Sequence, residues 1–233
     1  MTTKHLSSQF DSELNSISSR IMELGGLVEA QINLAMSALA QFNSDAADGV
    51  ILHEVQVNQL EVDIDHELIS LIARRQPTAR DLRLLIAISK TTTNLERAGD
   101  EAVKIARMVK SIASTHAPKT LPSPELKIAA DLAAALIRDA LDALVRLDID
   151  AAAKIMKDDD VIDAEFSGFI RKLITYMMED PRTISPSLNL LFAAKAIERI
   201  GDHAKNIAEF VIYIVKGADV RHASAEQLDA ALR

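Results

Sequence analysis

One five-residue phrase occurs twice in this 233-residue chain, and this repeat constrains the fold more than any other feature of the sequence. The copies are Glu96-Arg97-Ala98-Gly99-Asp100 and Glu198-Arg199-Ile200-Gly201-Asp202. When the comparison is extended to Ala106 and Ala208, seven of eleven positions agree. Similarity at a fixed period is the sequence signature of repeated structural units. The chain is therefore expected to consist of two similar halves.

The composition indicates the type of secondary structure. The chain has only seven glycines and six prolines, and 3% of its residues are aromatic. Strands joined by frequent turns normally need more of these residues. Between residues 10 and 42, apolar side chains instead recur every three or four positions, which is the period of an amphipathic α-helix. The sequence therefore predicts an all-α protein.

Turn-forming residues divide the chain into six helices. Asn43-Ser44-Asp45 and Pro77 separate the first three helices, and three prolines within residues 116–124 mark a linker. The second half has turns at residues 148–150 and 180–181, and a final stop at Gly217. Ser123-Pro124 and Ser185-Pro186 are each expected to cap a helix and open its first turn. We predict two tandem antiparallel three-helix bundles, residues 1–117 and residues 118–233, the second with a short C-terminal tail.

Each copy of the phrase carries a glutamate and an aspartate four residues apart, which places both carboxylates on one helix face. The preceding helix of each half contains a similar acidic pair, at the matching strings Ile64-Asp65-His66-Glu67 and Ile162-Asp163-Ala164-Glu165. The midpoints between paired positions fall at residues 80–81 and 180–181, on the expected turns, so the pairs should lie level across each hairpin. The eight candidate ligands are Glu61, Asp65, Glu96 and Asp100 in the first half and Asp159, Asp163, Glu198 and Asp202 in the second.

Four carboxylates that face one another repel strongly unless a cation or several basic groups lie among them. The chain has no cysteine, so a metal would be held by oxygen or imidazole, which suits iron, zinc, manganese or magnesium. Gly99 and Gly201 lie inside helices at a cost of up to about 1 kcal/mol relative to alanine, which indicates a close approach to their backbone. The competing interpretation is that the acidic faces are simply solvated.

Several functions are not expected, because the chain lacks the residues that they require. The chain has no Gly-rich phosphate loop, no Ser/His/Asp set and no cysteine nucleophile, so an enzyme is not expected. A formal net charge of −8 argues against nucleic-acid binding. Neither a secretory signal nor 18 consecutive apolar residues occur, so we expect a cytoplasmic protein. The alternative from another class is a carboxylate-bridged metal store or oxidase, but its Glu-x-x-His template is absent.

The chain resembles the PhoU family over nearly its whole length. The segments that carry the resemblance are Leu95–Asp100, Ile197–Asp202, Arg75-Gln76-Pro77-x-x-x-Asp81-Leu82-Arg83 and Tyr176-Met177-Met178-Glu179-Asp180-Pro181-Arg182. The resemblance implies two three-helix bundles with acidic-x-x-x-Asp motifs that hold iron, zinc or other divalent ions. Carried over by position, it implies that the eight residues named above are the metal ligands, with Asp159 as a shorter arm than Glu61.

The resemblance also implies a regulatory role. A member of this family is expected to couple a phosphate ABC transporter, through its ATPase, to a sensor histidine kinase. It would repress the phosphate-starvation genes when phosphate is ample. A homodimer is expected as well, because long amphipathic helices carry more apolar surface than a three-helix unit buries.

Overall fold

The computed structural model describes residues 8–77, 79–115, 121–221, 223 and 227–228. Its long helices are α1 (Ser8–Gln41), α2 (Ser44–Arg75), α3 (Ala79–Ala113), α4 (Lys127–Arg146), α5 (Ile149–Glu179) and α6 (Ile184–Lys216). The described residues contain no strand, so the prediction of an all-α fold with six helices is confirmed. Among the described helices, none is both long and apolar enough to cross a membrane.

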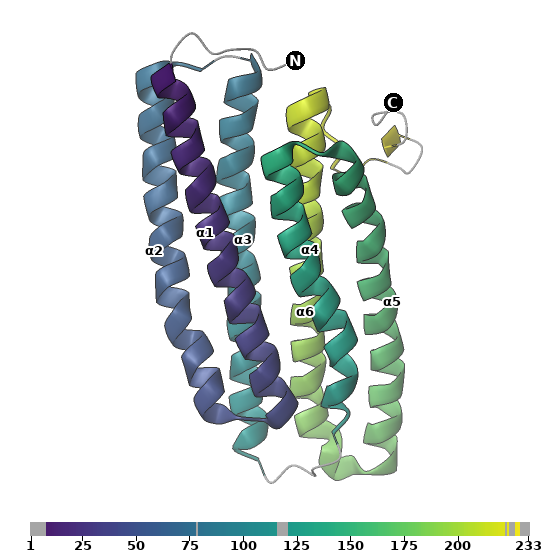
Figure 1. Ribbon diagram of the computed structural model, residues 1–233. Coiled ribbons are helices and arrows are strands. Elements are labelled where there is room, and N and C mark those ends of the chain that lie inside the picture. Colours follow the sequence, from purple (N-terminus) through teal and green to yellow (C-terminus); the bar gives the residue numbers. More distant parts are fainter. Residues whose placement is uncertain (1–7, 78, 116–120, 222, 224–226, 229–233) are drawn as a thin grey trace.

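The helices form two antiparallel three-helix bundles that stand side by side (Figure 1). The helices α1, α2 and α3 contact one another, and so do α4, α5 and α6. The helices α2 and α5 lie at the two outer edges, whereas α3 and α6 pack against each other between the bundles. The expected tandem bundles are therefore confirmed. The expected boundary between residues 117 and 118 lies outside the described residues.

The helices α3 and α6 run antiparallel and fix the relative height of the two bundles. The hydrogen bonds that connect them include Asn206 to Asn94 (3.1 Å), Arg199 to Glu101 (3.4 Å) and Asn189 to Ser111 (3.0 Å). In each of these pairs the two residue numbers add up to 300, as expected for antiparallel helices: moving up α3 by one residue means moving down α6 by one. Gly99 therefore lies level with Gly201, because 99 and 201 also total 300. The two copies of the repeated phrase meet at this height.

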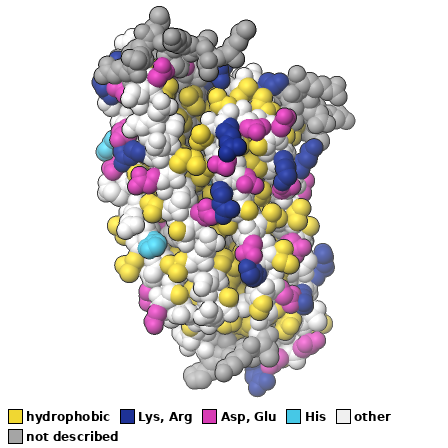
Figure 2. Space-filling model, in the orientation of Figure 1, with side chains coloured by type: hydrophobic (Ala, Val, Ile, Leu, Met, Phe, Trp, Pro, Cys, Tyr) yellow, Lys and Arg dark blue, Asp and Glu magenta, His cyan; other side chains and the backbone are white. Residues whose placement is uncertain are grey.

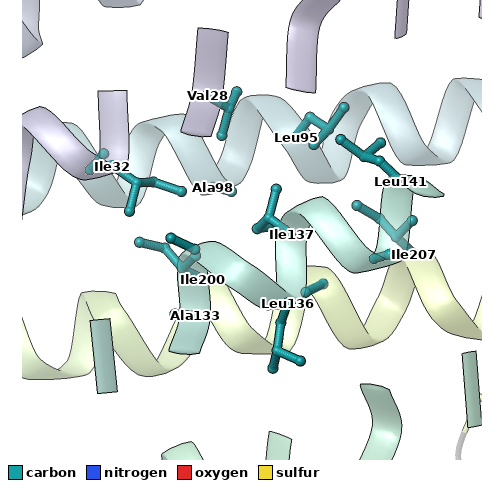
Figure 3. Close-up of a cluster of buried hydrophobic side chains, with 14 of the residues drawn as sticks. Val28, Ile32, Leu95, Ala98, Ala133, Leu136, Ile137, Leu141, Ile200 and Ile207 are labelled. Carbon is teal, nitrogen blue, oxygen red and sulfur yellow. The ribbon is translucent and has the colours of Figure 1, made fainter. Parts of the chain in front are cut away.

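A continuous apolar core joins the bundles between α1, α3, α4 and α6 (Figure 3). Its buried side chains include Val28, Ile32, Leu95, Ala98, Ala133, Leu136, Ile137, Leu141, Ile200 and Ile207. Ala98 and Ile200 occupy the one variable position of the repeated phrase. The phrase therefore contributes its apolar position to the interface between the halves.

Charged side chains of both signs are interspersed with apolar ones on the face that α1 and α4 form (Figure 2). Arg138 on α4 forms an ion pair with Glu29 on α1, so a surface contact also joins the bundles. On this face, neither sign of charge forms a continuous patch.

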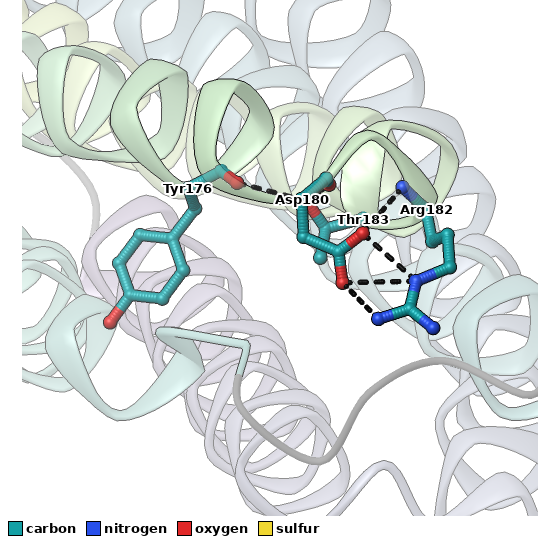
Figure 4. Close-up of polar contacts among 4 residues, drawn as sticks. All are labelled: Tyr176, Asp180, Arg182 and Thr183. Carbon is teal, nitrogen blue, oxygen red and sulfur yellow. Dashed lines mark hydrogen bonds and ion pairs between the residues drawn. The ribbon is translucent and has the colours of Figure 1, made fainter.

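Side chains at the turns fix where several helices begin. Asn43 accepts hydrogen bonds from the backbone N–H groups of Asp45 and Ala46 and so caps α2. In the turn between α5 and α6, Asp180 accepts from the backbone N–H and the guanidinium of Arg182 (Figure 4).

Two predicted helix starts differ from the structure. The helix α4 begins at Lys127, after a 3-10 helix over Ser123–Leu126, and Ser123 makes no capping hydrogen bond. The helix α6 begins at Ile184, so Pro186 lies in its first turn as predicted, but Thr183 and not Ser185 precedes the helix. Only at α4 does the predicted proline, Pro124, lie in a 3-10 turn instead of the α-helix itself.

Candidate functional site

Three carboxylates from two helices converge in the first bundle. Glu54 comes from α2, and Glu96 and Asp100 come from α3. Each offers one oxygen, and the three oxygens all lie within 4.8 Å of one another. We call these residues the first carboxylate group. Glu96 and Asp100 are candidates that the sequence predicts, whereas Glu54 is revealed only by the structure.

Gly99 makes room for the side chain that holds Glu54. A Cβ at Gly99 would lie only 2.9 Å from Oε1 of Gln31 on α1, and at ordinary contact distance, 3.5 Å, from Oε2 of Glu54 and Cγ1 of Val57. The missing side chain therefore lets Gln31 approach α3 beside the phrase, where its amide donates to Glu54. This is the kind of close approach that the glycine in a helix interior had indicated.

Gly201 has the corresponding surroundings in the second bundle. A Cβ there would lie 2.8 Å from both Oδ1 of Asp159 and Cδ1 of Ile162. In each half, the acid beside the glycine therefore stands three residues before a buried apolar residue. By this contact Glu54 corresponds to Asp159, and Val57 to Ile162, with a separation of 105 in both cases.

Glu61 and Asp65 lie seven or more residues further along α2 than Glu54, toward the hairpin. Asp65 accepts a hydrogen bond of 3.2 Å from the hydroxyl of Ser89. Glu61 is half-buried near the first carboxylate group, where its charge helps to raise the pKa of Glu96. From the sequence, Glu61 corresponds to Asp159, whereas the contacts assign Glu54 to that place. Glu54 and Glu61 are seven residues apart and share a helix face, so the periodicity of the sequence does not distinguish them.

In the second bundle the four predicted residues interact through their charges, but no three of their oxygens lie as close together as those of the first carboxylate group. Asp159 and Asp163 come from α5, and Glu198 and Asp202 come from α6. The charges of the other three all act on the pKa of Asp202. We call these residues the second carboxylate group. Asp159 is only 1% exposed.

Two lysines accompany the second carboxylate group. Lys205 donates from Nζ to Oδ2 of Asp159 across 3.0 Å. Lys195 donates from Nζ to Oε1 of Glu198, and the same Nζ lies 5.3 Å from the centre of the Phe166 ring. Burial alone would lower the pKa of Lys205, but the hydrogen bond and the charge of Asp159 raise it. Lys205 therefore remains a cation at neutral pH.

Burial disfavours the charged form of the carboxylates in both groups. Burial, and then the charges of neighbouring acids, raise the pKa values of Glu54 and Glu96. In the second group, burial and the charges of Glu198 and Asp159 raise the pKa of Asp202 to about 6. Burial also raises the pKa of Asp159, although the Lys205 ammonium opposes this effect. Both groups therefore favour a nearby positive charge when they are ionised.

Gln31 on α1 completes the surroundings of Glu54. Its side chain is fully buried, and Nε2 donates to Oε2 of Glu54 (2.6 Å) and to the carbonyl of Val50 (3.2 Å). Oε1 of Gln31 and Oε1 of Glu54 are buried without a hydrogen-bond partner among the described residues. Buried acceptors without a donor are costly. A set of carboxylate oxygens beside such acceptors fits a hard divalent cation.

A groove of about 570 Å³ between α3 and α6 adjoins both carboxylate groups. Its lining consists of charged and polar side chains: Arg97, Asp100, Glu101, Lys104, Arg199, Asp202, His203, Lys205 and Asn206. Asp100 belongs to the first group and Asp202 to the second, so one groove gives solvent ions access to both.

Comparison with known proteins identifies the family. Residues 21–109 and 126–211 of this chain each match the PhoU domain. The chain belongs to the PhoU family. A phosphate-specific transport system accessory protein PhoU homolog from a Burkholderia species is 52% identical over 98% of this chain and 97% of its own length. The phosphate-specific transport system accessory protein PhoU of Escherichia coli K12 is 45% identical over 98% of this chain and 94% of its own.

Solved PhoU structures share the fold. The crystal structure of PhoU from Pseudomonas aeruginosa is 44% identical, covers 90% of this chain and 100% of its own, and superposes with a TM-score of 0.85. The phosphate transport system regulatory protein PhoU from Streptococcus pneumoniae is 27% identical and superposes with a TM-score of 0.84, over 91% of this chain and 99% of its own. The chain thus belongs with accessory and regulatory proteins of phosphate transport.

Proposed function

We propose that this protein is a regulatory adaptor that represses the phosphate-starvation response when phosphate is ample. It does so by coupling a phosphate ABC transporter, through the transporter ATPase, to a sensor histidine kinase. The observation that carries this proposal is the match along 98% of the chain to PhoU accessory proteins of phosphate transport. In this proposal the protein acts in the cytoplasm as a homodimer, without catalysing a reaction.

The carboxylate groups are proposed to hold iron, zinc, manganese or magnesium ions. The convergence of Glu54, Glu96 and Asp100, beside the unpartnered oxygen of Gln31, supports this assignment. When bound, such an ion neutralises the carboxylates. Glu61 and Asp65, and the second carboxylate group, stay predicted ligands.

Binding of an ion would change how the helices around the site pack, and so the position of the helix surfaces that face solvent. Gln31 orients Glu54 on α2, while Glu96 and Asp100 project from α3. Neutralising their repulsion allows α2 and α3 to pack closely. Because α3 also packs against α6, the spacing of α2 becomes linked to the second bundle. We propose that partners recognise helix surfaces whose positions are fixed in this way.

A phosphate-starvation reporter tests the link between the carboxylates and regulation. The strain lacks its own copy of the gene and expresses either the wild type or the double variant Glu96→Gln/Asp100→Asn in phosphate-rich medium. We expect the wild type to keep the reporter off and the double variant to leave it on, at equal protein levels. Asp131→Asn is the control, because Asp131 is an exposed carboxylate on α4 that pairs with Lys127. Full repression by the double variant would separate the carboxylates from regulation.

Direct binding measurements test the proposed partners and the proposed dimer. The purified chain is titrated separately with the transporter ATPase and with the cytoplasmic part of the kinase. We expect both to bind, and failure of the kinase to bind would contradict the coupling role. Light scattering at micromolar concentration is expected to give twice the 25.4 kDa mass of the chain. A monomeric mass would contradict the dimer.

A further inference from the structure

The two carboxylate groups differ in what holds the acid beside the glycine. In the second bundle, the ammonium of Lys205 donates to Asp159 across 3.0 Å. In the first bundle, the neutral amide of Gln31 donates to Glu54 across 2.6 Å. Corresponding carboxylates thus face a cation in one half and an uncharged donor in the other.

The lysines have no counterparts in the first bundle. The two copies of the phrase are 102 residues apart. At this separation, Lys205 corresponds to Val103 and Lys195 corresponds to Thr93. Val103 and Thr93 carry no charge. The second half therefore has two cationic side chains at positions where the first half has uncharged ones.

Other contacts hold the two lysines at their carboxylates. Asp159, the acceptor for Lys205, is 1% exposed, and the side chain of Lys205 is itself 32% exposed. Lys195 lies above the Phe166 ring while it bonds to Glu198. An ammonium over an aromatic face gains a further attraction. Each lysine acts as a tethered cation against one carboxylate of the second group.

The first carboxylate group has no bound ammonium of this kind among the described residues, although the charges of Arg97 and Lys104 act on Glu96 from a greater distance. Within the described part of the chain, the ion pairs include no lysine or arginine bound to Glu54, Glu96 or Asp100, and Lys104 pairs with Glu101 instead. The fully buried Gln31 leaves its Oε1 without a donor there. Glu198 in the second group also has a buried oxygen without a partner, Oε2, but Lys195 donates to its other oxygen. In the first group no bound ammonium offsets the buried acceptor beside the three carboxylates, so a cation from solution is favoured there.

We infer that the first carboxylate group is the tight metal site of this protein, and that in the second group Lys205 and Lys195 stand in for a metal ion. This inference rests on the proposed function, which assigns ions to these carboxylates. A divalent cation entering the second group has to displace two ammonium groups from their carboxylates. In the first group it displaces none. The first half thus has the tighter ion site, whereas in the second half two lysines already neutralise carboxylates and weaken the binding of an ion.

Manganese titration of the chelator-treated full chain tests this inference, with calorimetry and elemental analysis as readouts. The variant Glu96→Gln/Asp100→Asn is expected to lose Mn²⁺ affinity by more than about 100-fold, beyond the loss typical when only a supporting residue is removed. The matched variant Glu198→Gln/Asp202→Asn is expected to stay within about twofold of the wild type, because no tight site is lost. Equal losses in the two variants, or a loss only in the second, would overturn the inference and leave metal binding itself intact.

Removing a lysine supplies the converse test. On the Glu96→Gln/Asp100→Asn background, Lys205→Met is expected to raise the Mn²⁺ affinity of the second group by at least about 10-fold, because a competing cation is gone. Lys154→Met is the matched control, since Lys154 pairs with the neighbouring Asp158 and not with Asp159. Should Lys205→Met fold only when Mn²⁺ is present, this result would itself support the inference. In that case Lys195→Met, at a more exposed lysine, repeats the test.

The outcomes separate this inference from the proposed function. No gain in either lysine variant, with folding shown by circular dichroism, would contradict the role of the lysines. If the wild-type chain bound no Mn²⁺ at all, the metal assignment under the proposed function would fail, and the inference would fail with it.

Discussion

Gly201 on α6 lies so close to Asp159 on α5 that a Cβ at position 201 would fall 2.8 Å from Oδ1 of Asp159. The same Cβ would fall 2.8 Å from Cδ1 of Ile162. Asp159 is buried, and its other oxygen accepts from Lys205, so it has little room to move. This contact explains a glycine at a position where alanine would favour the helix by about 1 kcal/mol.

The first prediction concerns this contact. Gly201→Ala should lower the free energy of unfolding by about 1–3 kcal/mol, as overpacking in a filled interior does. Urea denaturation measures the change. Gly26→Ala is the matched control inside α1, where an added Cβ meets nothing within 4 Å. The control should raise the free energy of unfolding by about 0.5–1 kcal/mol. A stabilised Gly201→Ala protein would contradict the close packing.

Much of the fold could be predicted because its signals are local or periodic. The amphipathic period, Pro77 and Gly217 indicated helices and their ends, and the repeated phrase indicated two bundles. The start of α4 was misplaced because proline suits both an α-helical first turn and a 3-10 turn. Only packing against other helices decides between them.

The candidate site was harder to predict than the fold. Glu96 and Asp100 could be identified because they repeat with Glu198 and Asp202. Glu54 was missed because it is held by Gln31 on α1, which packs against Gly99 on α3, and contacts between residues so far apart are not visible in the sequence. The pattern Glu54-x-x-Val57, matched to Asp159-x-x-Ile162, is the signal that would have found it.

The second prediction concerns the interface between the bundles. Ile200 is fully buried in the core that joins α3 and α6. Ile200→Ala should lower the free energy of unfolding by about 2–5 kcal/mol, because it removes buried methyl groups and leaves a cavity. Val161→Ala is the control, since Val161 is 49% exposed on α5, and its effect should stay within about 0.5 kcal/mol. Similar small effects in both variants would show that the bundles do not depend on this core.

The third prediction concerns Gln31. Gln31→Leu removes the amide that holds Glu54 and should weaken Mn²⁺ binding by about 10–100-fold, as loss of a ligand's supporting partner does. Gln59→Leu is the control, because Gln59 donates to Asp63 on the exposed side of α2. Calorimetric titration distinguishes the two variants. Unchanged affinity in Gln31→Leu would mean that Glu54 needs no support or does not bind the ion.

The fourth prediction concerns pH. The pKa of Asp202 is about 6 in the folded protein, above its ordinary value of 3.8. This carboxyl group therefore stabilises the fold below pH 3.8, and the contribution is lost as the pH rises through about 6. The groups that act on it are Glu198 and Lys195 on α6 and Asp159 and Asp163 on α5.

Asp202→Asn isolates this effect from other titrating groups. His203 works in the opposite direction, because burial lowers its pKa to about 4 and its contribution is lost as the pH falls. In chelator-containing buffer, urea unfolding of the wild type and of Asp202→Asn is compared between pH 4 and pH 7. The variant should lose less stability as the pH rises. Identical pH profiles would contradict a raised pKa for Asp202.

Anomalous X-ray diffraction from crystals soaked in Mn²⁺ decides whether the first carboxylate group holds an ion. We expect an anomalous peak among the oxygens of Glu54, Glu96 and Asp100, and a weaker peak or none beside Lys205. The absence of any peak at the first carboxylate group, in crystals where Mn²⁺ has access to the groove, would contradict the claim that this group holds an ion.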